Sequence, residues 1–154
     1  MRALSEISFT PEQCKAASLR PFWARCVPDS YRPLLLSLFG DWFFADSSDR
    51  VHMLDLVSGQ LRQVADSDIE FFAMLDFEEH RSEWLMSHLV EAAEHAGIKR
   101  SPSQCFAFRT PPCLGGSLSP ANLVAWDFAT YQRGASKLFQ QVADLPEGTQ
   151  VIAK

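Results

Sequence analysis

The sequence predicts an α+β protein in which helices pack on an antiparallel sheet. Three short runs rich in aromatic and branched residues, separated by turn signals, predict a three-strand meander. Longer stretches with apolar residues at helical spacing follow, together with two later strand-like runs. With 154 residues, of which 47% are apolar and 12% aromatic, the chain is long enough to form a single globular unit with a sizeable core.

The chain is expected to divide into an N-terminal helical arm, residues 1–35, and a main α+β domain, residues 36–154. Within the arm, Thr10 is expected to cap a helix that has Pro11 in its first turn. That helix is expected to end before Pro21, because proline lacks the N–H group that a helix interior needs.

The next segment is expected to contain one more helix and then the meander. Leucines at helical spacing predict a helix from Tyr31 to Phe39, and Gly40 would end it. Three strands are expected at residues 41–46, 50–56 and 60–65. The two connections are only three residues long, which favours antiparallel pairing.

A capping box begins the helical part of the main domain. Ser67 and Glu70 stand three positions apart, so that each side chain can satisfy a backbone N–H group at the start of a helix. The helical spacing of Ile69, Phe72 and Leu75 predicts that these three residues form its inward stripe.

The remaining elements follow from the same patterns. A helix is expected from Ser82 to Ala96, a strand from Gln104 to Arg109 and a final helix from Thr130 to Ala143. The apolar run from Leu123 to Trp126 predicts a buried strand on which the earlier hairpins and the last helix pack. Val151 and Ile152 suggest a terminal strand.

The stretch before that run contains a structural motif rather than a catalytic one. Adjacent glycines, Gly115 and Gly116, permit backbone geometry that other residues resist. Neither of the glycine-rich phosphate-binding patterns is present around them. We therefore expect Gly115, Gly116, Asn122 and Asp127 to shape the local backbone.

The sequence shows no arrangement that specifies catalysis, a cofactor or a metal. His88, Glu91, Glu94 and His95 share a predicted helix, but the H-E-x-x-H pattern and a second ligand-bearing helix are missing. The cysteines show no C-x-x-C pair, and free thiols are expected for all of them: Cys14, Cys26, Cys105 and Cys113. The sequence shows no signal peptide and no apolar run long enough to span a membrane, which favours a cytoplasmic protein without membrane contact.

The charge is unevenly distributed along the chain. Residues 41–95 carry thirteen acidic and three basic groups, although the net charge of the whole chain is only −5. Such a segment disfavours nucleic acid, whose phosphates need clustered Lys and Arg. It favours a basic protein partner, although a solvated acidic surface without a partner is the alternative.

Several motifs in this order resemble one family. They are L-D-L-x-x-G at residues 54–59, P-P-x-L-G-G at residues 111–116, Asn122, and D-L-P-x-G-T at residues 144–149. Over residues 36–152 the chain is similar to the C-terminal domain of the Tdi-type immunity proteins of bacterial type VI secretion systems, many of which are uncharacterised. A looser similarity links it to the SMI/KNR superfamily of cell-wall regulators and immunity proteins.

The resemblance implies a non-enzymatic protein that binds and neutralises a cognate secreted toxin, with a DNase or other nuclease as the expected target. A nuclease needs a basic surface to hold phosphates, so acidic residues could compete for it. The candidates lie at strand turns and helix ends: Asp46, Asp49, Asp66, Asp68, Glu78 and Glu79. The alternatives are a regulatory adaptor of the SMI/KNR type and a small-ligand protein with a pocket near His52, Trp84 and His88.

Overall fold

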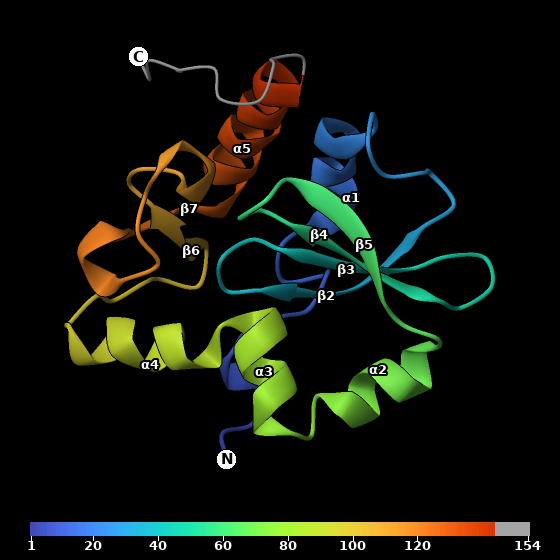
Figure 1. Ribbon diagram of the computed structural model, residues 1–154, viewed down its shortest axis with the longest axis horizontal. Helices are drawn as coiled ribbons and strands as arrows, with labels where there is room; N and C mark the ends of the chain where they lie inside the picture. The colour runs from blue at the N-terminus through green and yellow to red at the C-terminus, as the bar shows by residue number, and fades with distance from the viewer. Residues whose placement is uncertain (144–154) are drawn as a thin grey trace.

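The computed structural model describes residues 1–143 and shows two antiparallel sheets surrounded by helices (Figure 1). The main sheet has five strands in sequential order, and this confirms the predicted α+β class. The expected strand at Val151 and Ile152 lies outside the described residues. The strands of the main sheet are β1 (Ser8–Phe9), β2 (Arg32–Ser37), β3 (Trp42–Ala45), β4 (Val51–Asp55) and β5 (Gln60–Ala65).

The predicted meander is confirmed as β3, β4 and β5, and β3 lies at the centre of the main sheet. All four residues of β3 are buried, because side chains alternate between two covered faces. The Trp42 indole meets the C-terminal helix through a hydrogen bond to Gln132. Phe43 points to the other side, where its ring packs on Phe71 at a centroid distance of 5.1 Å.

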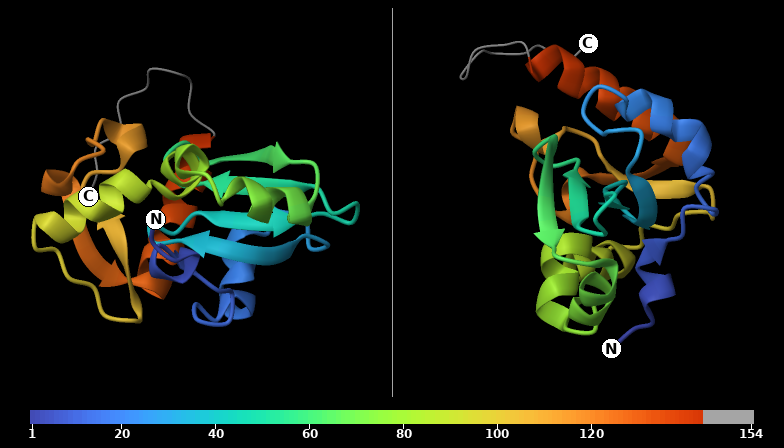
Figure 2. Two further views of the ribbon diagram at one scale, coloured as in Figure 1. Left: turned by 90° about the horizontal axis from the view of Figure 1, so that it is seen from below. Right: turned by 90° about the vertical axis from the view of Figure 1, so that its right-hand side faces the viewer.

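Two helical layers therefore enclose the main sheet (Figure 2). On one side lie α1 (Ala16–Leu19), the 3-10 helix η2 (Arg20–Trp23) and the long helix α5 (Phe128–Ala143). On the other side lie α2 (Asp68–Met74) and α3 (Glu78–Leu85), and α4 (Ser87–His95) continues toward the second sheet. Short 3-10 turns complete the chain: η1 (Leu4–Glu6), η3 (Pro112–Leu114) and η4 (Pro120–Asn122).

The prediction of a helix from Tyr31 to Phe39 is wrong, since this segment contains the strand β2. Its leucines match helical spacing, but a short apolar run fits a strand buried on both faces equally well. β2 lies between β1 and β3, so that Leu36 is opposite Phe9 on one side and Trp42 on the other. Gly40 adopts φ +92° in the turn that leads to β3.

The expected helix between Thr10 and Pro21 is much shorter than predicted. The Thr10 hydroxyl accepts a hydrogen bond from the Gln13 N–H, and the Gln13 side chain accepts one from the Thr10 N–H. These bonds close a local turn, and Lys15 then takes a left-handed conformation with φ 52°. Regular α-helix is consequently confined to the four residues of α1.

The single helix expected from Ser82 to Ala96 is two helices, α3 and α4. Met86 separates them in a left-handed conformation with φ 49°. The Glu78 carboxylate spans the break, because it accepts a hydrogen bond from the Ser87 hydroxyl at 2.7 Å. A methionine carries no sequence signal for such a break, unlike Gly or Pro.

The helix start at Ser67 is confirmed, whereas the inward stripe predicted for α2 is correct for Leu75 and wrong for Ile69 and Phe72. The Ser67 hydroxyl accepts the Glu70 N–H, and the Glu70 carboxylate accepts the N–H of Asp66 rather than that of Ser67. Phe71 and Leu75 are the buried positions, one helical turn apart. Ile69 and Phe72 point to solvent instead.

The second sheet contains β6 (Gln104–Phe108) and β7 (Leu123–Asp127), which confirms both later strands. The prediction that β7 is a buried strand on which the earlier hairpins pack is wrong, because among the described strands β7 pairs only with β6 and Trp126 is 48% exposed, although α5 does contact β7 as expected. Instead, β6 is the buried strand. Its Phe106 N–H donates to the Leu38 carbonyl at 2.8 Å and so joins the second sheet to the turn after β2.

Gln132 fastens α5 to the main sheet. Its side-chain oxygen accepts hydrogen bonds from the indole N–H groups of Trp23 and Trp42, each at 2.8 Å. Its side-chain nitrogen donates to the Gly40 carbonyl at 2.8 Å. Since Gln132 is completely buried, this one amide satisfies polar groups from η2, β3 and the β2–β3 turn together.

Candidate partner-binding surface

The structure places the six candidate carboxylates in two groups. Asp46 and Asp49 lie in the β3–β4 turn, Asp66 lies between β5 and α2, and Asp68 is the first residue of α2. Arg32 connects these two turns, because its guanidinium contacts Asp49 at 2.9 Å and Asp68 at 3.2 Å. The second group, Glu78 and Glu79, begins α3.

Asp46 is a structural residue of the β3–β4 turn. Its carboxylate accepts the backbone N–H groups of Ser48 at 2.8 Å and Arg50 at 3.0 Å. It also lies 2.9 Å from the His52 ring nitrogen Nε2, and only 11% of the side chain is exposed. The hydrogen bond with His52, followed by those with the backbone, lowers the pKa of Asp46 to about 2. This carboxylate is therefore already engaged within the protein.

The other candidate carboxylates are more accessible. Asp66 is exposed and accepts a hydrogen bond from Gln63. Glu79 has 82% of its side chain exposed, and its nearest basic group is His80 at 3.7 Å. Each lies at one end of the segment that contains α2, so this segment could present negative charge to a partner.

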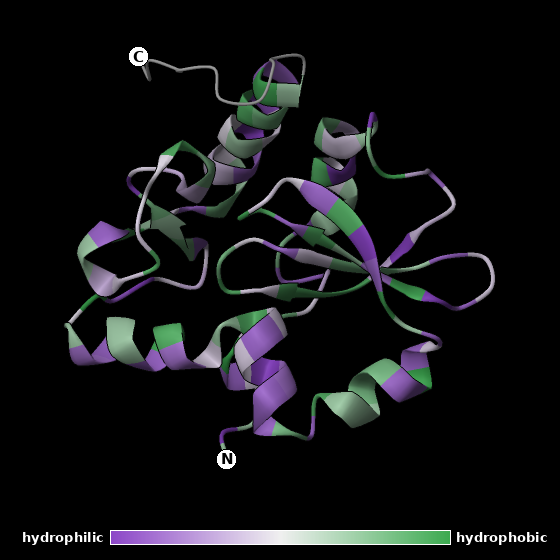
Figure 3. Ribbon diagram, viewed as in Figure 1, coloured by the Kyte–Doolittle hydropathy of each residue, from purple (hydrophilic) through white to green (hydrophobic). Residues whose placement is uncertain are grey.

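An exposed apolar group, which the sequence reasoning did not identify, lies between those carboxylates. Ile69 is 81% exposed, Phe77 63% and Phe72 38%. Helical periodicity had placed Ile69 and Phe72 in the core, because it cannot tell which side of a two-turn helix faces the sheet. Figure 3 shows apolar and polar residues mixed along α2. The high local content of acidic residues was the available signal that this helix is exposed.

We refer to this surface as the α2–α3 face. It comprises the three apolar side chains of Ile69, Phe72 and Phe77 and the acidic residues of the segment 66–83: Asp66, Asp68, Glu70, Asp76, Glu78, Glu79 and Glu83. The segment has one basic residue other than histidine, Arg81, and it is buried. The Arg81 guanidinium donates to the backbone carbonyls of Leu75 and Arg2, so it presents little positive charge at the surface.

The histidines do not assemble into a reactive site. Trp84 and His88 line a cavity of about 250 Å³, but His52 is not among its lining residues and is bound to Asp46 instead. His88 is hydrogen-bonded to Ser82 at 2.8 Å, and Glu94 pairs with Arg2 at 3.0 Å. Among residues 1–143, no group of three His, Cys, Asp or Glu side chains has the geometry to hold a metal ion.

All four cysteines are free. Burial raises the pKa of the Cys14 and Cys105 thiols to about 12 in each case. Burial also raises the pKa of Cys26 and Cys113. Since the thiolate is the reactive form of cysteine, none of the four has the environment of an activated nucleophile.

The double-glycine stretch forms the loop between β6 and β7. A Cβ atom on Gly116 would lie 1.8 Å from the Thr110 carbonyl oxygen. The backbone at Gly116 therefore lies too close to the Thr110 backbone to leave room for a side chain. Asn122 donates to the carbonyls of Thr110 and Ser117 and accepts the Thr110 N–H. Gly115 adopts φ +94°.

Asp127 performs a separate local task at the start of α5. Its carboxylate accepts hydrogen bonds from the Thr130 N–H at 2.9 Å and from the Thr130 hydroxyl at 2.8 Å. These bonds lower the pKa of Asp127. They give α5 an N-terminal cap and fix the angle at which the helix leaves β7.

Comparison with known families identifies the part of the chain that contains this surface. Residues 65–138 match the family model described as T6SS immunity protein Tdi1, C-terminal. This region is similar to the Tdi1-type immunity family. The resemblance indicated by the motifs is thereby confirmed, over a shorter range than the expected residues 36–152. No curated protein matches the chain.

The family region begins at the last residue of β5 and extends from α2 into α5. It includes the α2–α3 face and the loop with Gly116 and Asn122, whereas the L-D-L-x-x-G motif precedes it. The D-L-P-x-G-T motif lies outside the described residues. Within residues 1–143, no helix combines the length and the apolar character that crossing a bilayer requires. The family assignment supports an immunity role.

Proposed function

We propose that this protein binds and neutralises a cognate type VI secretion effector and that the effector is a nuclease. The observation that carries the proposal is the family match, because the matched region contains the acidic α2–α3 face. A nuclease holds the phosphates of its substrate with Lys and Arg. A protein surface that supplies carboxylates to those side chains can occupy the same site and exclude the nucleic acid.

Neutralisation in this proposal is a binding reaction and requires no chemistry, no cofactor and no membrane. We place the protein in the bacterial cytoplasm, where it would meet a nuclease before the nuclease reaches nucleic acid. The N-terminal arm and the main domain act as one unit, a proposal supported by the pairing of Ser8 and Phe9 in β1 with β2.

The test uses the effector whose gene neighbours the gene of this protein. The purified effector is assayed on plasmid DNA and on RNA with increasing amounts of this protein, and the mixture is run on a size-exclusion column. We expect nuclease activity to be lost near an equimolar ratio and the two proteins to elute together. Unchanged cleavage together with separate elution would reject the proposal. Co-elution with an effector that has no nuclease activity would preserve the immunity role and reject the nuclease target.

A further inference from the structure

We infer that the effector docks on the α2–α3 face. The docking surface of the effector would then consist of apolar side chains surrounded by lysines and arginines. The inference rests on the proposed function and adds to it the location of the interface and the chemistry of the partner surface. Two independent observations support it, the exposure of large apolar side chains and the distribution of charge around them.

The apolar side chains are concentrated in a short part of the chain. Of the six large apolar residues that are exposed within residues 1–143, three lie between residues 69 and 77. Ile69 and Phe72 are one helical turn apart and therefore share one side of α2. Exposed aromatic and aliphatic residues grouped in this way are typical of the centre of a protein interface.

The attachment of α2 to the fold does not depend on Ile69, the most exposed of these side chains. α2 is attached through Phe71, whose ring stacks with Trp84 at 5.5 Å, and through the buried Leu75. Ile69 lies on the opposite side and contributes little to that packing, since most of its surface is accessible. A partner that covers Ile69 would remove its apolar surface from water, and this burial would stabilise the complex.

The surrounding charges determine which kind of partner fits. The segment 66–83 contains seven acidic residues, and within residues 1–143 Asp76 and Glu83 form no salt bridge. A symmetric dimer through this face would bring acid against acid, and nucleic acid or an anionic membrane would be repelled. A basic protein surface complements both the apolar centre and the acidic rim.

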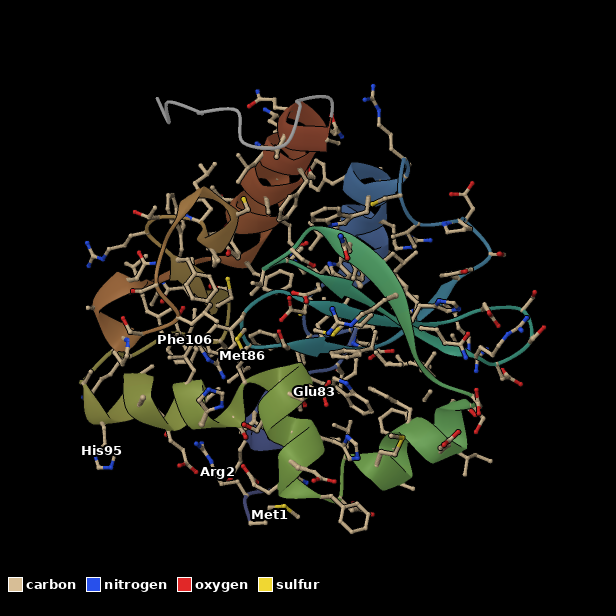
Figure 4. The ribbon with its side chains drawn as sticks, in the orientation of Figure 1. Met1, Arg2, Glu83, Met86, His95 and Phe106 are labelled. Carbon is tan, nitrogen blue, oxygen red and sulfur yellow. The ribbon has the colours of Figure 1, made fainter. Side chains whose placement is uncertain are left out.

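The neighbouring elements leave the face accessible. In Figure 1, α2 and α3 lie on the side of the sheet opposite α5 and the second sheet lies beside α4. The labelled side chains in Figure 4 place Glu83 on α3 and place Met1 and Arg2 next to the α3–α4 region. Arg2 is paired with Glu6 and Glu94, so its guanidinium adds little free positive charge at this border.

The experiment measures affinity for a catalytically inactive form of the neighbouring effector by titration calorimetry. Ile69→Arg and Glu79→Lys change the face, and their matched controls are Trp126→Arg, also exposed and apolar, and Glu12→Lys, also exposed and acidic. Each substitution on the face is expected to raise Kd about tenfold or more, as at the centre of an interface. Each control is expected to stay within about twofold of the unchanged protein.

The possible outcomes separate the two proposals. If the unchanged protein binds and the two face variants bind equally well, the effector docks elsewhere and the inference fails while the proposed function stands. If the unchanged protein does not bind, both fail. Hydrogen exchange of the complex supplies a readout independent of mutant folding, and we expect slowed exchange in residues 66–83. Protection confined to another region would overturn the inference, and so would a dimer of the free protein that Ile69→Arg dissociates.

Discussion

Single buried polar residues join the elements of this protein, and Gln132 connects α5 to η2, β3 and the turn before β3. Replacement with leucine would leave the indole N–H groups of Trp23 and Trp42 and the Gly40 carbonyl without their partner. A buried polar group without a hydrogen bond costs about 1–3 kcal/mol. We therefore expect Gln132→Leu to lower the free energy of unfolding by about 2–5 kcal/mol, measured by urea denaturation.

Gln140 provides the matched control for that substitution. It lies on the same helix and is exposed, so Gln140→Leu is expected to change stability by less than about 0.5 kcal/mol. If Gln132→Leu were as stable as this control, the indole groups would have to find other partners. The sequence did not reveal Gln132, because its three partners come from segments about ninety or more positions away.

Asp41 makes the stability depend on pH. Its carboxylate is buried, accepts the Leu56 N–H and the Ser37 hydroxyl, each at 2.7 Å, and has a pKa raised by burial to about 7. The pKa of this carboxylate in an unfolded chain is 3.8. Between pH 3.8 and about pH 7 the folded state therefore holds a proton that the unfolded state lacks. The stabilising contribution of Asp41 to the free energy of unfolding is therefore complete below about pH 4 and is lost as the pH rises through 7.

The matching experiment compares urea midpoints at pH 5 and pH 8 for the unchanged protein and Asp41→Asn. We expect the difference between the two pH values to shrink in the variant, because a neutral amide does not titrate. The effect on the free energy of unfolding is on the order of 2–3 kcal/mol between these two pH values. Asp76→Asn, at an exposed position, is the control and should keep the original pH dependence. An unchanged dependence in Asp41→Asn would show that another group causes it.

At the scale of elements, the β6–β7 loop depends on one close backbone contact. An alanine at position 116 would place its Cβ against the Thr110 carbonyl, which is backbone and cannot rotate away. We expect Gly116→Ala to reduce stability by about 2–4 kcal/mol in thermal or chemical unfolding. Gly134→Ala is the control, since Gly134 lies in α5 with open space around it, and alanine favours helix by up to about 1 kcal/mol. Equal stability of the two variants would contradict the prediction.

Local signals determined some elements and tertiary contacts determined others. The meander and the start of α2 were predictable, because short turns and a capping serine act within a few residues. β2 was not, because its burial depends on β1 and β3 on either side. The break at Met86 likewise results from how α3 and α4 pack rather than from a residue that favours left-handed backbone.

The candidate site was predictable in composition and not in arrangement. The excess of acidic residues in the middle of the chain can be read from the sequence, and it includes the segment that contains α2 and α3. It could not show that Asp46 is engaged in a turn or that Arg32 pairs with Asp49 and Asp68. Nor could helical periodicity show that Ile69 points outward, because both sides of α2 carry apolar residues.

For the whole molecule, the sheet separates two differently charged layers. Helices α2, α3 and α4 contain seven acidic residues and one arginine, which is buried, whereas α5 carries Arg133 and Lys137 and has no acidic residue. A basic partner approaching from a distance is therefore guided toward one side of the protein rather than attracted uniformly. This separation matters for the rate of association more than for the strength of the final contact.

Salt should consequently slow association of the complex that we propose. We expect the association rate constant with the inactive effector to fall about tenfold or more between 50 and 500 mM NaCl, since the Debye length shortens to a few ångströms. The dissociation rate should change much less. Glu79→Lys should act mainly on association, whereas Ile69→Arg should act mainly on dissociation, because the apolar contact forms only after docking. Surface plasmon resonance across a salt series measures both constants. An association rate that is independent of salt would show that the acidic layer does not guide the effector, even if the complex forms.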